Sequence, residues 1–225
     1  MNDTPKKIST KIYRPILEAL EEKLEAACLR RDAYLNKVLE VELPYLDKEG
    51  TENSSEAQQF IANRLDQLDR KQISLALRPD LVERLNEICA RKRIVRDAFF
   101  NRLFFLLLAH SKGGVRVVSE LFFNGTEDWR EWMWEGEDMM YQALTPLAEN
   151  IDPFWLIHLG FEILERDGQI QEGEGIYSTV WSDTKYKEPF LLALSCYLPN
   201  EQVPDHPETL ARRKKAEDFL ASLLL

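Results

Sequence analysis

The sequence contains no long apolar run, few cysteines and no leader-like start. No run approaches the roughly 18 to 20 apolar residues that cross a bilayer, so we expect no membrane-spanning helix. The opening Met-Asn-Asp-Thr-Pro-Lys-Lys is not followed by the apolar segment of a signal peptide, which indicates a cytoplasmic protein. The three cysteines are far apart and have neither a CxxC spacing nor a nearby histidine pair, so neither a disulfide framework nor a zinc site is indicated.

Signals for catalysis are also scarce. The glycines of residues 168–175 lie among acidic residues, which would repel a phosphate. No serine or cysteine has a recognisable activating neighbour, so we expect no enzyme and no cofactor. His158, Glu162 and Glu165 recur at i, i+4 and i+7 of an expected helix, a spacing compatible with metal ligands. One histidine with two glutamates on an amphipathic helix is usually a solvated stripe, so we predict no metal site.

The charge of the chain is unevenly distributed. The 225 residues are 44% hydrophobic and 30% charged, as in an ordinary soluble protein with a core, and the net charge is -10. Residues 70–110 nevertheless carry nine Lys/Arg against four Asp/Glu, whereas residues 111–205 carry six against eighteen. A basic module is therefore joined to an acidic one.

The most informative feature is an internal repeat. Residues 8–37 aligned without a gap on residues 73–102 match at nine of thirty positions, where random composition would give about two. The identical positions of the first copy are Ile8, Ser9, Glu18, Leu20, Glu22, Arg31, Asp32, Ala33 and Asn36. One supersecondary unit therefore occurs twice.

Each copy predicts one strand and two helices. Residues 7–13 alternate between apolar and polar, which is typical of a strand. Pro15 suits the first turn of a helix that reaches about Cys28, and a second helix is expected from about Arg30 until Pro44 stops it. A lone strand leaves both edges of its backbone unpaired, so each unit requires the other.

The second copy repeats this order, with a strand over residues 72–78, a helix after Pro79 and a helix from about Val95. The pattern Ile73-Ser74-Leu75-Ala76-Leu77-Arg78-Pro79-Asp80-Leu81, followed by Ile94-Val95-Arg96-Asp97-Ala98-Phe99, resembles the ribbon-helix-helix superfamily of MetJ, Arc and CopG-type DNA-binding proteins. The resemblance implies a mainly α fold, in which a tandem pseudo-dimer supplies one two-stranded antiparallel ribbon and four helices. The ribbon of this family lies in the DNA major groove.

Alternation along the two strands predicts which side chains face DNA. Ile8, Thr10, Ile12, Ile73, Leu75 and Leu77 should point into the core. The outward residues, assigned to base edges, are Lys7, Ser9, Lys11, Tyr13, Gln72, Ser74, Ala76 and Arg78. Lysine and arginine can donate to guanine and glutamine can pair with adenine, whereas Ala76 can only touch a thymine methyl. The strands differ, so an imperfect palindrome is expected, and a merely solvated sheet face is the alternative.

In this family the second helix holds a phosphate at its N-terminus, usually with a serine or threonine cap. Arg30 and Val95 occupy the expected cap positions here. The predicted phosphate contacts are therefore the arginines Arg30, Arg31, Arg93 and Arg96. The alternative is that they are solvated or pair with the neighbouring aspartates. For the repeated Asp32/Asn36 and Asp97/Asn101 we expect a structural role, as hydrogen bonds across the pseudo-twofold.

The predicted organisation is a first unit in residues 1–43, a linker in 44–70, a second unit in 71–112 and an acidic, mostly helical domain in 113–225. The linker should carry a helix capped by Ser54 or Ser55. Residues 103–109 are apolar on every side, so residues beyond Gly114 or a second chain should cover them.

In the last domain, helices are expected near residues 127–149, 153–166, 187–198 and 207–224, and residues 115–118 could form a strand. Trp129, Trp132 and Trp134 lie in an acidic context and could form a partner surface, although core packing is the simpler explanation.

Together these patterns predict sequence-specific binding of double-stranded DNA through the ribbon, as a transcriptional regulator that represses by occupancy. The alternative is an interaction scaffold or antitoxin-like protein whose acidic domain binds another protein. A protein partner for the C-terminal domain and a homo-oligomer both remain open, and no membrane partner is expected.

Overall fold

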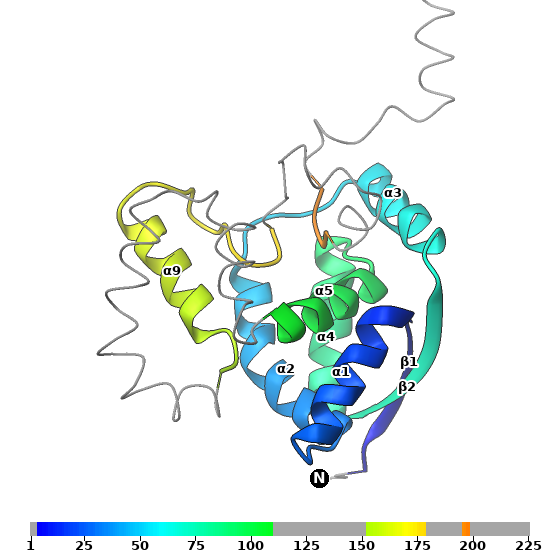
Figure 1. The fold of residues 1–225 in the computed structure, drawn as a ribbon. Coiled ribbons are helices and arrows are strands. Elements are labelled where there is room, and N and C mark those ends of the chain that lie inside the picture. The colour runs from blue at the N-terminus through cyan, green and yellow to red at the C-terminus, as the bar shows by residue number, and fades with distance from the viewer. Residues whose placement is uncertain (1–3, 110–151, 179–194, 199–225) are drawn as a thin grey trace, which may run out of the picture.

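The computed structural model describes residues 4–109, 152–178 and 195–198, and this part of the chain is mostly helical with one two-stranded antiparallel sheet (Figure 1). In chain order the elements are β1 (Lys6–Tyr13), α1 (Arg14–Ala26), α2 (Arg31–Lys48), α3 (Ser55–Asp66), β2 (Arg70–Leu77), α4 (Pro79–Lys92), α5 (Arg96–Ala109) and α9 (Trp155–Arg166). None of the described helices has both the length and the apolarity needed to cross a membrane.

The two strands pair along their whole length, with Ser9 opposite Ser74. These serines are also equivalent in the repeat, because both lie at the position that the offset of 65 residues relates. The ribbon is thus centred on a pair of corresponding residues, as a twofold axis through that pair would require.

The predicted inner face of the ribbon is confirmed, and most of the predicted outer face is exposed. The residues buried on the inner side are Ile8, Thr10, Ile12, Leu75 and Leu77, and Ile73 is partly buried. Lys7, Ser9, Lys11, Gln72 and Ser74 are exposed on the outer side. Period-two alternation therefore identified the inward-facing residues of both strands.

Helices α1 and α4 follow the two strands directly, and each has proline in its first turn. Their buried residues recur at helical spacing and join the core beneath the ribbon: Ile16, Leu17, Leu20 and Leu24 in α1, and Leu81, Val82, Leu85 and Ile88 in α4. Cys28 and Arg93, which follow these helices at equivalent positions of the repeat, both have left-handed backbones, with φ of 55° and 52°. The two turns are therefore alike in conformation although neither uses glycine.

The prediction that Pro44 ends its helix is wrong. Helix α2 continues through this exposed proline to Lys48, so the expected boundary at residue 43 falls inside a helix. Proline removes one backbone hydrogen bond, but the flanking Leu43 and Leu46 are fully buried, and packing of this kind overrides local propensity. The ring of Tyr45 also stacks on the imidazole of His158, with centroids 3.5 Å apart.

In the linker, the prediction of a capped helix is confirmed. The hydroxyl of Ser54 accepts a hydrogen bond from the Ala57 N–H at 3.0 Å at the start of α3. The strand that follows begins at Arg70, two residues earlier than predicted.

Residues beyond Gly114 cover α5, as expected from its apolar sequence. The Tyr177 ring lies 5.3 Å from that of Phe99, and the fully buried Arg102 donates to the Ile176 carbonyl. Phe154, Ile157 and Cys196 belong to the same core. The described segments of the C-terminal half, residues 152–178 and 195–198, are thus packed onto the two strand-helix-helix units.

The expected helix near residues 153–166 is confirmed by α9. The prediction of a helix over residues 187–198 is wrong for its last four residues, because residues 195–198 are not helical. Their backbone instead forms hydrogen bonds with the side chain of Asn53, which donates to the Cys196 carbonyl at 2.7 Å and accepts from the Leu198 N–H at 2.9 Å. The helices expected near 127–149 and 207–224, the strand at 115–118, and Trp129, Trp132 and Trp134 lie outside the described residues.

Candidate nucleic-acid interface

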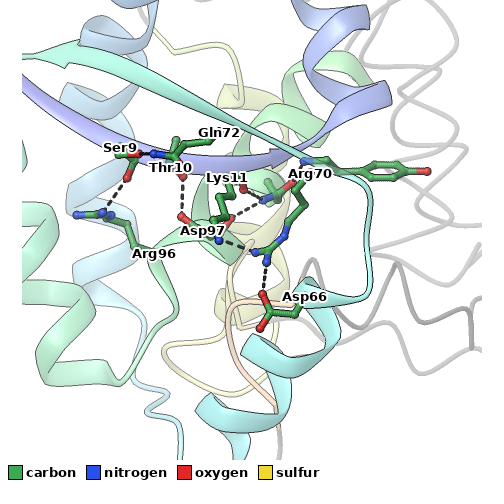
Figure 2. A network of polar contacts seen from close by, with 10 residues as sticks. Ser9, Thr10, Lys11, Asp66, Arg70, Gln72, Arg96 and Asp97 are labelled. Carbon is green, nitrogen blue, oxygen red and sulfur yellow. Dashed lines mark hydrogen bonds and ion pairs between the residues drawn. The ribbon is translucent and has the colours of Figure 1, made fainter.

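The outer face of the ribbon combines exposed lysines with small polar side chains. Neither strand contains an acidic residue. Lys11 lies opposite Gln72, and Lys7 lies opposite Ala76. Gln72 donates through Nε2 to Ser9 Oγ at 2.8 Å, which ties the two strands near the centre of this face (Figure 2). The face can donate hydrogen bonds and attract anions, and it contributes no negative charge.

Two lysines near the ends of the strands lie outside the expected strand bounds. Lys6 and Lys71 are exposed and occupy equivalent positions of the repeat, but they have the parity of the inward residues and so lie at the margin of the ribbon, not on its outer face. The expected strands began one residue later, at Lys7 and Gln72, and so left both lysines out. Their equivalence in the repeat was the signal that could have included them.

The repeated asparagines hold the ribbon from below. Asn101 of α5 donates to the Lys11 carbonyl at 2.9 Å and accepts from the Tyr13 N–H at 2.8 Å. Asn36 of α2 makes the corresponding contacts with β2, to the Ala76 carbonyl at 3.2 Å and from the Arg78 N–H at 2.7 Å. Each copy therefore holds the strand of the other copy. The hydrogen bonds expected from Asn36 and Asn101 across the pseudo-twofold are confirmed.

The repeated aspartates also reach the strand of the other copy. Asp32 accepts from the Ala76 N–H at 3.0 Å, and Asp97 accepts from the Thr10 hydroxyl at 2.8 Å. Asp97 lies 3.7 Å from the guanidinium of Arg70, which also pairs with Asp66 (Figure 2). These contacts position the ribbon backbone and orient its outer face.

Two of the four predicted phosphate-binding arginines bind the ribbon itself. Arg31 donates to the Ser74 carbonyl at 3.0 Å. Arg96 makes the equivalent contact with the Ser9 carbonyl at 2.9 Å, which Figure 2 shows. Arg31 also pairs with Glu21 at 2.7 Å. Both arginines are partly buried at the centre of the sheet, so a phosphate would have to compete with, or share, their existing contacts.

The other two arginines lie at the turns after α1 and α4 and are exposed. Arg30 precedes α2 without forming a side-chain cap, as its identity predicted. Arg93 donates to the Asn53 carbonyl at 3.1 Å and lies 4.0 Å from Glu52. Both positions leave charged groups accessible at the edge of the same module.

Three of the predicted base-facing residues do not lie fully exposed on the ribbon. Tyr13 and Ala76 are partly buried at the two ends of the ribbon. Arg78 lies just beyond β2 as the residue preceding α4, and its guanidinium pairs with Asp80 at 2.8 Å and Glu40 at 3.3 Å. The ribbon thus brings together Lys7, Ser9, Lys11, Gln72 and Ser74 as one exposed group, and Arg78 is held at its border.

Comparisons with family models, with curated proteins and with solved structures gave no match to this chain.

Proposed function

We propose that this chain is a tandem ribbon-helix-helix protein that binds double-stranded DNA sequence-specifically and regulates transcription by occupying its site. The observation that carries the proposal is the exposed, acid-free ribbon centred on Ser9 and Ser74. A two-stranded ribbon fits the major groove, where each base pair presents a distinct pattern of donors and acceptors.

The distribution of charge supports the same orientation. The outer face of the ribbon carries two exposed lysines, Lys7 and Lys11, and no acidic residue, although the whole chain has a net charge of -10. A chain with this imbalance is repelled by DNA through its net charge and attracted where the lysines gather on the ribbon. Its approach to the duplex is therefore restricted to one face.

The two halves of the ribbon present different groups on either side of the central serines. One half offers Lys11 beside Gln72, which suits a guanine near an adenine. The other half offers Lys7 beside Ala76, which suits a guanine near a thymine methyl. The proposed target is therefore an imperfect palindrome, and each good bidentate contact contributes about 1–3 kcal/mol of discrimination.

The test is selection of bound fragments from random double-stranded DNA by the full chain at physiological salt. The parent should enrich one short, imperfectly symmetric site. Lys11→Ala should lose the preference on one side of its centre, and Lys7→Ala should lose it on the other. Lys48→Ala, an exposed lysine at the end of α2, is the matched control and should select the parent's site.

Salt dependence separates base contacts from phosphate contacts. Binding through Z phosphates weakens with a log-log slope of about -0.9Z, so a lysine that contacts a phosphate lowers the slope by about one when it is removed. A lysine that reads a base changes the selected site more than the slope. No enrichment by the parent, or one unchanged site for all three variants, would refute the proposal.

The second candidate is a protein-interaction scaffold, in which the acidic C-terminal half binds a protein partner. The internal contacts of Arg31 and Arg96 favour it, because these arginines already serve the sheet. A scaffold would not bind DNA at any salt concentration, so the same experiment decides between the two functions.

A further inference from the structure

A buried polar cluster joins α2 to the C-terminal half, on elements that do not form the ribbon. Glu42 of α2 is fully buried, and His158 of α9 is only 5% exposed. His158 Nε2 lies 2.9 Å from Glu42 Oε1. Together with Asp152, which precedes α9, these residues place one imidazole nitrogen and two carboxylate oxygens within 4.8 Å of one another. This is a donor set that transition metals accept.

The cluster carries more negative than positive charge. Within the described residues, neither Glu42 nor Asp152 forms an ion pair with a lysine or an arginine, and Glu42 pairs only with His158. Glu42 is fully buried and Asp152 is partly buried, and carboxylates withdrawn from water are stabilised by a nearby cation, so the site favours a positive ion.

Each of the three side chains is also held by a further group. The Tyr177 hydroxyl donates to Glu42 Oε2 at 2.7 Å, which leaves Oε1 facing the histidine. The Tyr45 ring stacks on the imidazole of His158 at an interplanar angle of 6°. The Phe154 N–H donates to Asp152 Oδ1 at 2.8 Å. Outer partners of this kind orient the ligands of metal sites.

A small cleft of about 40 Å³ adjoins the cluster at His158, and its lining carries four glutamates and one lysine, Lys48. Glu162, Glu165 and Glu174 line this cleft as well. Glu49 is only 6% exposed and also lines it, and its Oε2 accepts no hydrogen bond from the described residues. The cleft would concentrate cations at the entrance of the site.

We propose that Glu42, Asp152 and His158 bind one divalent transition-metal ion, for which Zn²⁺ is the best chemical match. Zinc accepts histidine nitrogen and carboxylate oxygen at about 2.0–2.2 Å, and a water can complete its four ligands. At these bond lengths the ligand atoms lie about 3.3–3.6 Å apart. The His158 and Glu42 atoms, now 2.9 Å apart, would separate to admit the ion, and Asp152, within 4.8 Å of both, would complete the set. Mg²⁺ and Ca²⁺ fit less well, because they prefer more oxygen ligands and no imidazole.

The proposal differs from the ligand set that helical spacing alone suggests. On α9, His158 shares a face with Glu162 and Glu165, but its Nε2 faces Glu42 of α2. Glu165 instead lies 3.8 Å from Lys48. Substitutions on α9 can therefore distinguish the two sets, and the result does not depend on DNA binding.

The experiment is titration of the chelator-stripped full chain with Zn²⁺, by calorimetry and by competition with a chromophoric chelator. The parent should bind one equivalent, and His158→Gln and Asp152→Asn should each weaken that binding more than tenfold. Glu165→Gln, in the cleft but outside the cluster, is the matched control and should bind as the parent does. Co²⁺ in the parent should give the visible absorption of a tetrahedral site, and Asp152→Asn should lose it.

Asp152 is partly exposed, so Asp152→Asn is expected to fold, and circular dichroism of the metal-free variants checks this. If His158→Gln does not fold, Asp152→Asn decides the question. Parent-like binding in a folded Asp152→Asn variant would overturn the proposal. So would failure of the parent to bind Zn²⁺, or loss of binding in Glu165→Gln.

Discussion

Replacing Asn101 by alanine should destabilise the fold far more than the equivalent change at Asn36. Asn101 is fully buried and holds the Lys11 carbonyl and the Tyr13 N–H at 2.9 and 2.8 Å. A fully buried backbone group that loses its partner costs about 1–3 kcal/mol. Both hydrogen bonds of Asn101 are only partly buried, which favours the lower part of the summed range, so the expected loss for Asn101→Ala is about 2–4 kcal/mol. This is a large part of the roughly 5–15 kcal/mol that stabilises a typical domain.

Asn36 makes the same two kinds of contact but is partly exposed, so water can replace its amide. Asn36→Ala should therefore cost only about 1 kcal/mol. Equilibrium unfolding in urea, followed by far-ultraviolet circular dichroism, measures both values. Asn63→Ala is the control, because this exposed asparagine bonds only the side chain of Gln59 among the described residues, and it should change stability little. Equal losses for Asn36→Ala and Asn101→Ala, or a loss below about 1 kcal/mol for Asn101→Ala, would refute the reasoning.

Three further changes test other parts of the fold. Burial raises the pKa of Glu49 to about 7, so the folded state keeps a proton that the unfolded state loses between pH 4.5 and 7, and stability should fall over this range. Glu49→Gln removes that dependence, so the stability of this variant relative to the parent, measured from urea midpoints, should rise with pH by roughly 3 kcal/mol. Glu52→Gln changes an exposed glutamate and should show no such rise. Pro44→Ala should raise the melting temperature, since the new N–H can complete the helix and restore up to about 3 kcal/mol; a lower melting temperature would contradict this. Cys28→Gly should gain about 1 kcal/mol in urea unfolding by relieving the left-handed backbone, whereas Cys28→Ala should gain nothing.

Local patterns in the sequence were sufficient to predict the ribbon and the helices that follow its strands. The alternation of residues 7–13 identified the buried Ile8 and Ile12, and the serine before α3 identified its cap. These features depend on neighbours within one or two turns. Pro44 shows where such reasoning fails, because the turn after it is held by packing against α9, more than one hundred residues later.

The polar cluster could not have been derived from spacing. Glu42 and His158 are separated by 116 residues, and nothing in either segment identifies the other as its partner. From the sequence alone, the only candidate partners of His158 are Glu162 and Glu165 on its own helix. In the same way, Arg31 and Arg96 were assigned to phosphates from their charge, and their contacts with strand carbonyls depend on how the two copies are paired.

Apart from the central serines Ser9 and Ser74, the two copies keep the residues that hold the ribbon and differ in the residues that it exposes. Arg31 and Arg96, like Asn36 and Asn101, make equivalent contacts with the strand of the other copy. At the outward positions, the alignment of the two copies instead places Lys7 against Gln72, Lys11 against Ala76 and Tyr13 against Arg78, which are different residues in each case. A dimer of identical chains must present the same groups twice, whereas a single chain can vary one half without disturbing the contacts that set the register. If the ribbon reads DNA as proposed, its target has a direction, and the acidic half of the bound chain then lies on a defined side of the site.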